Sequence, residues 1–217
     1  MISILLPTYN GEKYIKESID SILSQTFKDF ELLIGFNGTT DSSKQIVSEY
    51  NDPRIRVFYY NDKGKSKTLN RLLKESLYDW IAIQDDDDIW IPNKLEVQMK
   101  YTQDHDIIGT HINYIDEYGN ITGTPNLLSD HYDITRLSLN GNNQVANTSA
   151  IFKKCDANLV GGWNENFDGI EDFDFWLKLI RRGKKFINIP EKLVLHRIHK
   201  NSNFNTKKWD LNKILKC

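Results

Sequence analysis

The sequence predicts an α/β fold in which a mostly parallel central sheet is flanked by helices. Two observations support this fold class. Between residues 2 and 83, short apolar runs alternate with segments in which apolar residues recur at helical spacing. No internal repeat or low-complexity segment interrupts this order. Because strand–helix–strand connections are right-handed, the alternation indicates a parallel sheet with both faces covered.

The bulk composition allows one sizeable core and excludes several classes of protein. The chain has 217 residues, 39% of them hydrophobic and 27% charged, as in ordinary globular proteins. A formal net charge of -2 gives no general attraction for nucleic acid. Cys155 and Cys217 show no metal-binding spacing, and Pro7 ends the first apolar run too soon for a signal peptide. No run approaches the ~18 apolar residues of a membrane span, so we expect a cytoplasmic protein or one facing the cytosol.

Four strands and three helices are predicted in the first half of the chain. The strands are expected at residues 2–6, 30–36, 54–60 and 80–83. The apolar positions that define the intervening helices are Ile15, Ile19, Ile22 and Leu23, then Ile46, Val47 and Tyr50, then Leu69, Leu72, Leu73 and Leu77.

The second half is less regular. Its predicted elements are a helix at 92–99, a hairpin at 106–123, a strand at 144–153, a helix at 171–182 and short strands at 186–189 and 193–198. No linker is evident. We therefore expect one domain with a nucleotide-binding half (1–104), an acceptor-binding half (105–200) and a tail (201–217).

An acidic run, Asp85–Asp88, follows the fourth predicted strand. In open α/β sheets, ligands bind beyond the carboxyl ends of the strands, which is where this run would lie. Carboxylate oxygens suit Mg²⁺, Mn²⁺ and Ca²⁺, and an extended segment would direct Asp85 and Asp87 to one side, with Asp86 and Asp88 facing elsewhere. A solvated acidic turn is the alternative. The apolar residues on both sides of the run favour a metal site.

Residues 61–70, NDKGKSKTLN, form a basic, glycine-containing loop before a helix. Gly64 allows close backbone approach, and Lys63, Lys65 and Lys67 supply positive charge, which together suit a phosphate. The spacing is not that of a Walker A loop. A flexible basic loop is an equally good interpretation.

Carboxylates also gather at the start of the helix predicted at 171–182. Glu171 and Asp172 form a pair that could hold a general base with a raised pKa, whereas Asp174 fits simple helix capping. Trp163 and Trp90 are candidates for stacking on sugar rings. Trp176 is expected in the core.

Two histidines, His196 and His199, lie near the end of the ordered pattern. A lone histidine is more often structural than a ligand, but either could complete a metal shell. An imidazole among carboxylates would favour Mn²⁺ over Mg²⁺.

Taken in order, several motifs resemble those of inverting family 2 glycosyltransferases with the GT-A fold. The motifs are PTYNGEKYIKESIDSILSQTFKDFELLI, NGTTD, GKSKTLN, DDDDIWIPNKLE, GGWNENF with EDFDFWLKL, and HRIH. The resemblance covers residues 2–200. It implies a Rossmann-like central sheet with a smaller acceptor-side region.

The resemblance also implies roles for the residues at the matching positions. The positions expected to line the nucleoside pocket are Pro7, Thr8 and Tyr9. Asp87 should bind the metal that bridges the donor diphosphate, and Asp85 or Asp86 should touch the ribose or assist the metal.

On the catalytic side, Asp172 matches the family base, with Glu171 as its neighbour in the pair. Lys65 falls where some members place a donor-side lysine. His199 matches a histidine that reaches the diphosphate–metal group in some relatives. The implied cofactor is Mn²⁺ or Mg²⁺.

One departure from the family pattern concerns the base of the nucleotide. Relatives usually carry two aspartates after the second strand, where this chain has Phe36 and Asn37. Asn37 keeps an acceptor oxygen but adds two donors and loses the charge. UDP is therefore only the default nucleotide, and Phe36 could pack under the base or fill the core.

The expected activity is transfer of a sugar from a nucleoside-diphosphate sugar to a glycan, a lipid-linked molecule or a protein. A degenerate sugar-nucleotide-binding module and a sugar nucleotidyltransferase are the alternatives. The chain lacks the glycine-rich basic loop after the first strand that the latter needs. The tail is expected to form a docked helix or, alternatively, to contact a membrane surface.

Overall fold

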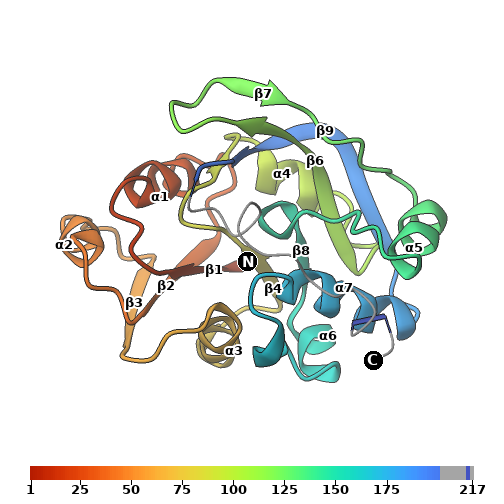
Figure 1. Cartoon of the computed structure of the whole chain (residues 1–217), viewed down its shortest axis with the longest axis horizontal. Coiled ribbons are helices and arrows are strands. Elements are labelled where there is room, and N and C mark those ends of the chain that lie inside the picture. Colours follow the sequence, from red (N-terminus) through yellow and green to blue (C-terminus); the bar gives the residue numbers. More distant parts are fainter. Residues whose placement is uncertain (201–213, 216–217) are drawn as a thin grey trace.

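The computed structural model describes residues 1–200 together with Ile214 and Leu215. Within this part of the chain, nine strands form one sheet in the order β3-β2-β1-β4-β8-β6-β9-β5, with β7 paired to β6 (Figure 1). The first-half strands are β1 (Ile2–Thr8), β2 (Phe30–Asn37), β3 (Ile55–Tyr60) and β4 (Trp80–Ile83). They pair in parallel, as predicted.

Helices cover both faces of this parallel part, and strand β1 shows how. Its residues Ile4 and Leu6 point into one apolar cluster, which also contains the buried apolar residues of α1 (Ile15–Leu23) and α2 (Ser43–Ser48). Leu5 points into the opposite cluster, with α3 (Lys65–Glu75). This alternation is the period of two that a strand imposes on its side chains. The three predicted helices are confirmed, although Leu77 lies beyond α3 and is exposed.

The second half adds short antiparallel pairings to the mostly parallel sheet. Its elements are β5 (Ile89–Trp90), α4 (Lys94–Met99), β6 (Ile107–Ile115), β7 (Ile121–Gly123), α5 (His131–Leu139), η1 (Asn147–Ser149), β8 (Ile151–Lys153), α6 (Lys154–Leu159), η2 (Glu165–Phe167), α7 (Glu171–Arg181) and β9 (Phe186–Arg197). The neighbours of β8, namely β4 and β6, both pair with it antiparallel. Strand β9 runs parallel to β6.

Several expectations for this half need correction. The strand expected at 144–153 is confined to β8, because η1 occupies residues Asn147–Ser149. The two short strands expected near the end form the single strand β9, whose pairing with β6 shifts register at His111. The hairpin of β6 and β7 and the helix α7 are confirmed. One sheet contains strands from both halves, so no break in the sheet marks the proposed boundary near residue 104 (Figure 1).

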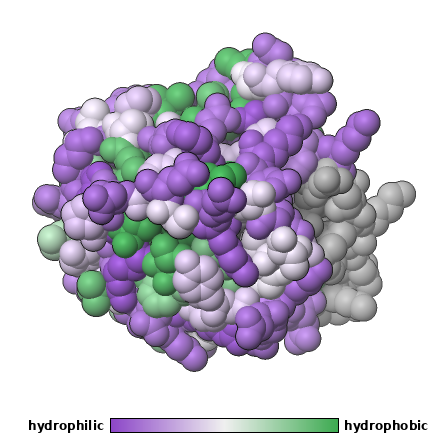
Figure 2. Space-filling model, turned by 90° about the vertical axis from the view of Figure 1, so that its left-hand side faces the viewer, coloured by the Kyte–Doolittle hydropathy of each residue, from purple (hydrophilic) through white to green (hydrophobic). Residues whose placement is uncertain are grey.

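Part of the tail packs on α7. Ile214 is fully buried against Phe173 and Leu177, and Arg181 donates a hydrogen bond of 2.9 Å to the carbonyl of Leu215. The remaining tail residues, and with them the predicted membrane contact, lie outside the described residues. In residues 1–200, 214 and 215, no helix combines the length and apolar character needed to cross a bilayer. The face on the side of α2 and β3 is mostly hydrophilic, with small apolar areas (Figure 2).

Candidate active site

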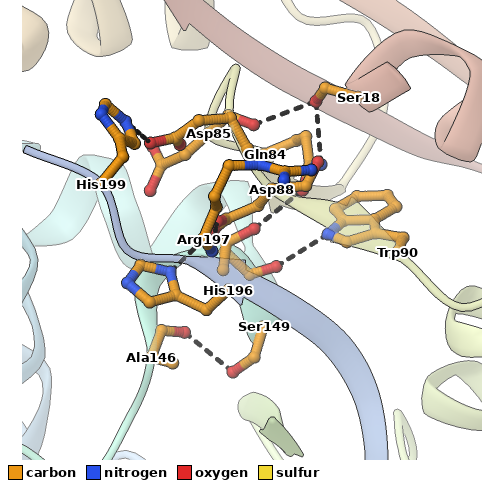
Figure 3. Close-up of polar contacts among 12 residues, drawn as sticks. Ser18, Gln84, Asp85, Asp88, Trp90, Ala146, Ser149, His196, Arg197 and His199 are labelled. Atoms are coloured by element: carbon orange, nitrogen blue, oxygen red, sulfur yellow. Dashed lines mark hydrogen bonds and ion pairs between the residues drawn. The ribbon is translucent and has the colours of Figure 1, made fainter. Parts of the chain in front are cut away.

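The acidic run forms a tight turn after β4. The backbone N–H of Asp88 donates to the carbonyl of Asp85 at 3.3 Å, and Gln84 and Ser18 fix the turn from inside the fold. Gln84 Nε2 donates to the Asp88 carbonyl at 2.7 Å, and Ser18 Oγ donates to the Asp85 carbonyl at 3.0 Å (Figure 3). A turn does not alternate its side chains as a strand does. Consequently Asp85, Asp86 and Asp87 all line one cavity, contrary to the expectation that Asp86 faces elsewhere.

Two of these carboxylates are paired with residues from the donor-side loops. Asp85 Oδ1 lies 2.6 Å from Lys65 Nζ. Asp86 accepts a hydrogen bond from the hydroxyl of Thr8, at the end of β1. Thr8 is therefore buried behind Asp86 rather than lining the cavity, which corrects its expected role in the nucleoside pocket.

The other two carboxylates are paired with the end of β9 and the residues after it. Asp87 Oδ2 lies 3.0 Å from His199 Nε2. Asp88 is fully buried, 2.9 Å from His196 Nδ1, and accepts the backbone N–H of Arg197 at 2.8 Å (Figure 3). Both histidines line the cavity. His199 contacts Asp87, and His196 contacts Asp88.

The environment separates the pKa values of these carboxyls. Burial, with the charge of Asp87 next, raises the pKa of Asp86 to about 7. Burial also acts on Asp87, but the hydrogen bond from His199 and the charge of His196 outweigh it, so its pKa falls below the usual range. Burial raises the pKa of Asp88 to about 6. At neutral pH the carboxylate of Asp87, which lines the cavity, is therefore negatively charged.

A lysine joins the acidic turn to the start of α7. Lys65 Nζ lies 3.2 Å from Glu171 Oε1 while it also contacts Asp85. Burial alone would lower the pKa of Lys65, but the two carboxylates outweigh burial and raise it well above its ordinary value. The ammonium is therefore a fixed positive charge between the two groups of carboxylates.

Asp172, the predicted base, is set apart from this ion pair. Its Oδ2 accepts a hydrogen bond of 3.0 Å from the side-chain amide of Asn143, and the residue lines the cavity. Burial, with the charge of Glu171 next, raises the pKa of Asp172 to about 7. A carboxyl with such a pKa can hold a proton near neutral pH, as a general base must.

These residues surround a single cavity of about 1150 Å³. Pro7 and Tyr9 line it from the end of β1, and Asn37 lines it from the end of β2; these are positions at which the sequence predicts nucleoside contacts. Tyr9 is partly exposed and accepts a hydrogen bond from Lys63. Phe36 is instead buried in the core, where it stacks on Tyr59 with ring centroids 5.4 Å apart.

The two tryptophans proposed for sugar stacking are core residues, and that prediction is wrong. Trp90 is 1% exposed, and its ring nitrogen donates to the carbonyl of Thr148 at 2.9 Å. Trp163 is 2% exposed and stacks on Phe175. Neither ring lines the cavity, because both fill space between the sheet and its helices.

The phosphate site expected at the start of α3 is occupied by the protein itself. Asp168 accepts the backbone N–H groups of Lys65 and Ser66 at 3.1 and 2.8 Å. The cap residue of this helix is Gly64, which has no side chain to offer. Asp168 supplies the missing acceptor from a hundred residues away. The free N-terminus that would bind a phosphate is therefore not available in this structure.

Sequence reasoning missed three residues that hold the site together. Asn143 contacts the candidate base, Asp168 caps α3, and Arg197 donates to the Asp87 carbonyl at 2.9 Å. Their partners are all distant in sequence, so no local pattern marks them. Only Arg197 could have been noticed in the sequence, because it lies between the two histidines of the HRIH motif.

The donor set of the acidic turn fits a hard divalent cation. Within the part of the chain that the structure describes, no three histidine, cysteine or carboxylate groups come together in a way that could hold a metal ion by themselves. Mg²⁺ sites that act on phosphates commonly use one or two carboxylates and complete the shell with substrate oxygens and water. Asp87 and Asp85 line the cavity and would supply oxygens to such a partly solvated ion, and His199 would add an imidazole, which suits Mn²⁺.

Comparison with known sequences identifies the family. Residues 3–158 match the glycosyl transferase family 2 model. The chain is 32% identical over 94% of its length to the uncharacterized glycosyltransferase MJ1057 of Methanocaldococcus jannaschii, of which it covers 73%. It is 33% identical over 93% of its length to the O-antigen biosynthesis glycosyltransferase WbnJ of Escherichia coli, of which it covers 81%.

A third relative is the UDP-Glc:alpha-D-GlcNAc-diphosphoundecaprenol beta-1,3-glucosyltransferase WfgD of Escherichia coli. The identity is 29%, over 83% of this chain and 70% of that protein.

Solved structures agree on the fold. S. aureus TarS 1-349 in complex with UDP-GlcNAc superposes with a TM-score of 0.82 at 19% identity, covering 98% of this chain and 64% of that one. The mannosyltransferase PcManGT from Pyrobaculum calidifontis, in complex with GDP-Man and Mn2+, gives a TM-score of 0.73 at 18% identity, covering 93% and 58%. The chain belongs to glycosyltransferase family 2, has the GT-A fold and is a glycosyltransferase.

Proposed function

We propose that this enzyme transfers a sugar from a nucleoside-diphosphate sugar to a hydroxyl of a glycan, lipid-linked or protein acceptor, with inversion at the anomeric carbon. One observation carries the proposal. Asp85 and Asp87, which suit a metal-bound diphosphate, and Asp172, which suits a general base, line the same cavity. Lys65 lies between the two groups, in contact with Asp85 and Glu171.

Each group has a part in this reaction. Asp172 accepts the proton of the acceptor hydroxyl as its oxygen attacks the sugar C1 from the face opposite the leaving diphosphate. Asn143 fixes the orientation of that carboxylate, because its amide donates to Oδ2. Lys65 supplies positive charge on the side where the departing diphosphate gains negative charge.

A divalent cation, Mn²⁺ or Mg²⁺, is the proposed cofactor, held by Asp87 and Asp85 with His199. When bound, it would neutralise the diphosphate as a Lewis acid and orient it. The bound Mn2+ of PcManGT supports this choice.

The donor is proposed to be a UDP-sugar. The UDP-GlcNAc bound by TarS and the UDP-Glc in the name of WfgD support it. The acceptor of WfgD, a diphosphoundecaprenol-linked sugar, supports a lipid-linked or glycan acceptor here. The donor half is assigned to residues 1–104, the acceptor half to 105–200, and the location to the cytoplasm or its membrane face.

The test uses donor consumption, since it needs no identified acceptor. The full chain would be assayed with Mn²⁺ and UDP-glucose, UDP-GlcNAc or GDP-mannose, as wild type and as Asp172→Asn. We expect the variant to lower kcat by about two to four orders of magnitude, which is the typical contribution of a general base.

The matched control is Asp133→Asn on α5, whose carboxylate pairs with Arg136 and does not line the cavity. It should leave turnover unchanged. Equal turnover by wild type and Asp172→Asn would remove this residue from the mechanism. No consumption of any donor by the wild type would favour a degenerate binding module.

A further inference from the structure

One side chain in the cavity wall has no protein partner. Asn147 lines the cavity and is 8% exposed, yet neither its amide nitrogen nor its amide oxygen has a hydrogen-bond partner among the described residues. A buried amide without partners is costly, and such groups are uncommon in native structures. This arrangement therefore calls for an explanation that involves a ligand.

The backbone around Asn147 is held firmly, so the amide does not need bonds of its own to stay in place. The hydroxyl of Thr148 donates to Gln84 Oε1 at 2.8 Å, and the carbonyl of Thr148 accepts from Trp90. Ser149 Oγ donates to the carbonyl of Ala146 at 2.8 Å (Figure 3). The 3-10 turn η1 thus fixes its backbone on both sides of Asn147.

A neighbouring asparagine shows the contrast. Asn143 uses both ends of its amide, donating to Asp172 at 3.0 Å and accepting the backbone N–H of Val145 at 3.1 Å. Two asparagines four residues apart thus line the same cavity, and the one that contacts the candidate base is satisfied. Asn147 is left with two donors and an acceptor.

The position of Asn147 suggests what its amide meets. The segment that carries it begins at Asn143, in contact with Asp172, and continues to Thr148, in contact with Gln84, the residue before Asp85. In the proposed reaction, the transferred sugar lies between the base and the diphosphate. Asn147 therefore lies along the wall beside that sugar.

We infer that Asn147 is a specificity-determining residue that binds hydroxyl groups of the donor sugar, an inference that rests on the proposed function. An amide offers a donor and an acceptor side by side, and a sugar hydroxyl can both accept and donate. Val145, Ala146 and Ile112 line the same cavity and offer apolar surface to the C–H faces of a sugar ring. A site that hydrogen-bonds a hydroxyl rejects analogues that lack it or hold it elsewhere, because its buried amide then stays unpaired.

The experiment compares wild type with Asn147→Ala in the full chain. Steady-state kcat/KM would be measured with Mn²⁺ for UDP-glucose and UDP-GlcNAc, together with the inhibition constant of UDP and the midpoint of thermal unfolding without ligand. We expect kcat/KM for the preferred donor to fall about tenfold or more and the preference between the two sugars to shrink. The inhibition constant of UDP should stay within about twofold.

The thermal midpoint distinguishes a binding role from a structural one. Because the amide makes no bond in the free protein and its burial is costly, Asn147→Ala should not lower the midpoint by more than about 2 °C and could raise it. Asn140→Ala is the matched control: this exposed asparagine of the preceding loop does not line the cavity, and its amide donates to the carbonyl of Arg136. It should change neither kcat/KM nor the preference between sugars.

Two results would overturn this inference but leave the proposed function intact. One is an active wild type whose Asn147→Ala variant keeps the same kcat/KM and sugar preference. The other is a variant in which the thermal midpoint, UDP inhibition and kcat/KM all worsen together, as a structural role predicts. A wild type that neither consumes a donor nor binds UDP would overturn the proposed function itself, and the inference with it.

Discussion

Neighbouring carboxyls at the start of α7 have different surroundings, and this separates their roles. Glu171 is 3% exposed, contacts Lys65 and accepts the N–H of Gly169, so its oxygens are committed within the protein. Asp172 lines the same cavity as Glu171, forms no ion pair with Lys65 among the contacts of the described residues, and accepts a hydrogen bond from Asn143. A general base needs a carboxylate oxygen available to its substrate, and the ion pair with Lys65 makes Glu171 the weaker candidate for that role. The resemblance to family 2 pointed to Asp172 as the base, and this difference in surroundings supports that proposal.

The pH dependence of the reaction should follow Asp172. Burial and the charge of Glu171 raise its pKa to about 7, and only the deprotonated carboxylate can accept a proton. We therefore expect kcat/KM to fall as the pH drops below about 7, approaching a tenfold loss per pH unit. A pH series of donor consumption checks this. A profile that is flat from pH 5 to 8 would contradict the role of Asp172.

Lys65 should also contribute to stability. In Lys65→Met, Asp85 and Glu171 would face the same space without their shared cation. Since the lysine side chain is 25% exposed, solvent screens part of this loss, and we expect the free energy of unfolding to fall by roughly 1–3 kcal/mol. Urea unfolding measures it. Lys67→Met, which removes a surface pair with Asp62, should cost under about 0.5 kcal/mol, and equal losses would argue against a special role for Lys65.

At the level of elements, the start of α3 depends on a residue that belongs to another part of the chain. Asp168 accepts two backbone N–H groups of that helix. Lys65 is the first residue of α3, so the cap also positions its ammonium. The loop before α7 and the basic loop before α3 are therefore one structural unit at the cavity.

Removing this cap should affect both stability and activity. Asp168→Ala leaves two N–H groups unpaired, and we expect a loss of about 0.5–2 kcal/mol in the free energy of unfolding. Donor consumption should also fall. The matched control is Asp130→Ala, which removes the acceptor for the N–H of Asp133 at the start of α5, away from the cavity. Asp130→Ala should lower the free energy of unfolding by a similar amount but leave donor consumption unchanged. Equal donor consumption by both variants would show that Asp168 does not support the active site.

The elements that could be predicted were those whose local sequence has a clear pattern of apolar residues. Apolar runs marked β1–β4, and helical spacing marked α1–α3 and α7. The short elements β5, α5 and α6 carry no such periodicity and were not predicted. Strand β9 was predicted as two pieces because Pro190 interrupts its apolar pattern. The D-x-D alternation failed because hydrogen bonds from Gln84 and Ser18 fold the acidic run into a turn.

In the candidate site, too, some residues could be predicted from local motifs and others could not. Asp85, Asp87, Lys65 and Asp172 were predicted from motifs and share one cavity. Trp90 was misjudged because a flat ring next to an acidic run suits a sugar and a core equally well, and only packing decides between them. The partners of these residues could not be predicted, because they come from segments that only the folded sheet brings together.

On the scale of the whole molecule, the last strand returns to the first half and completes the cavity. Strand β9 pairs with β6 and with β5, directly after the acidic turn. Asp88 and the Asp87 carbonyl bind Arg197, more than a hundred residues later in the chain. A ligand held by the acidic turn therefore touches parts of the chain that are connected only in the folded state.

Ligand binding should consequently stabilise the whole fold. At concentrations about 100 times the Kd, a ligand adds about 2.7 kcal/mol to the free energy of unfolding. For a chain of this size, that corresponds to a rise of roughly 5–10 °C in the midpoint of thermal unfolding. We expect UDP with Mn²⁺ to produce this rise and a chelator to abolish it. The same rise with UDP in the presence of the chelator would show that binding needs no metal.

The central claim is that Asp87 helps to hold the donor diphosphate through a divalent cation while Asp172 acts only in the chemical step. Calorimetric titration of UDP with Mn²⁺ into wild type, Asp172→Asn and Asp87→Asn tests it most directly. We predict that Asp172→Asn binds within about threefold of wild type and that Asp87→Asn binds at least about tenfold more weakly. Unchanged binding by Asp87→Asn would contradict the claim.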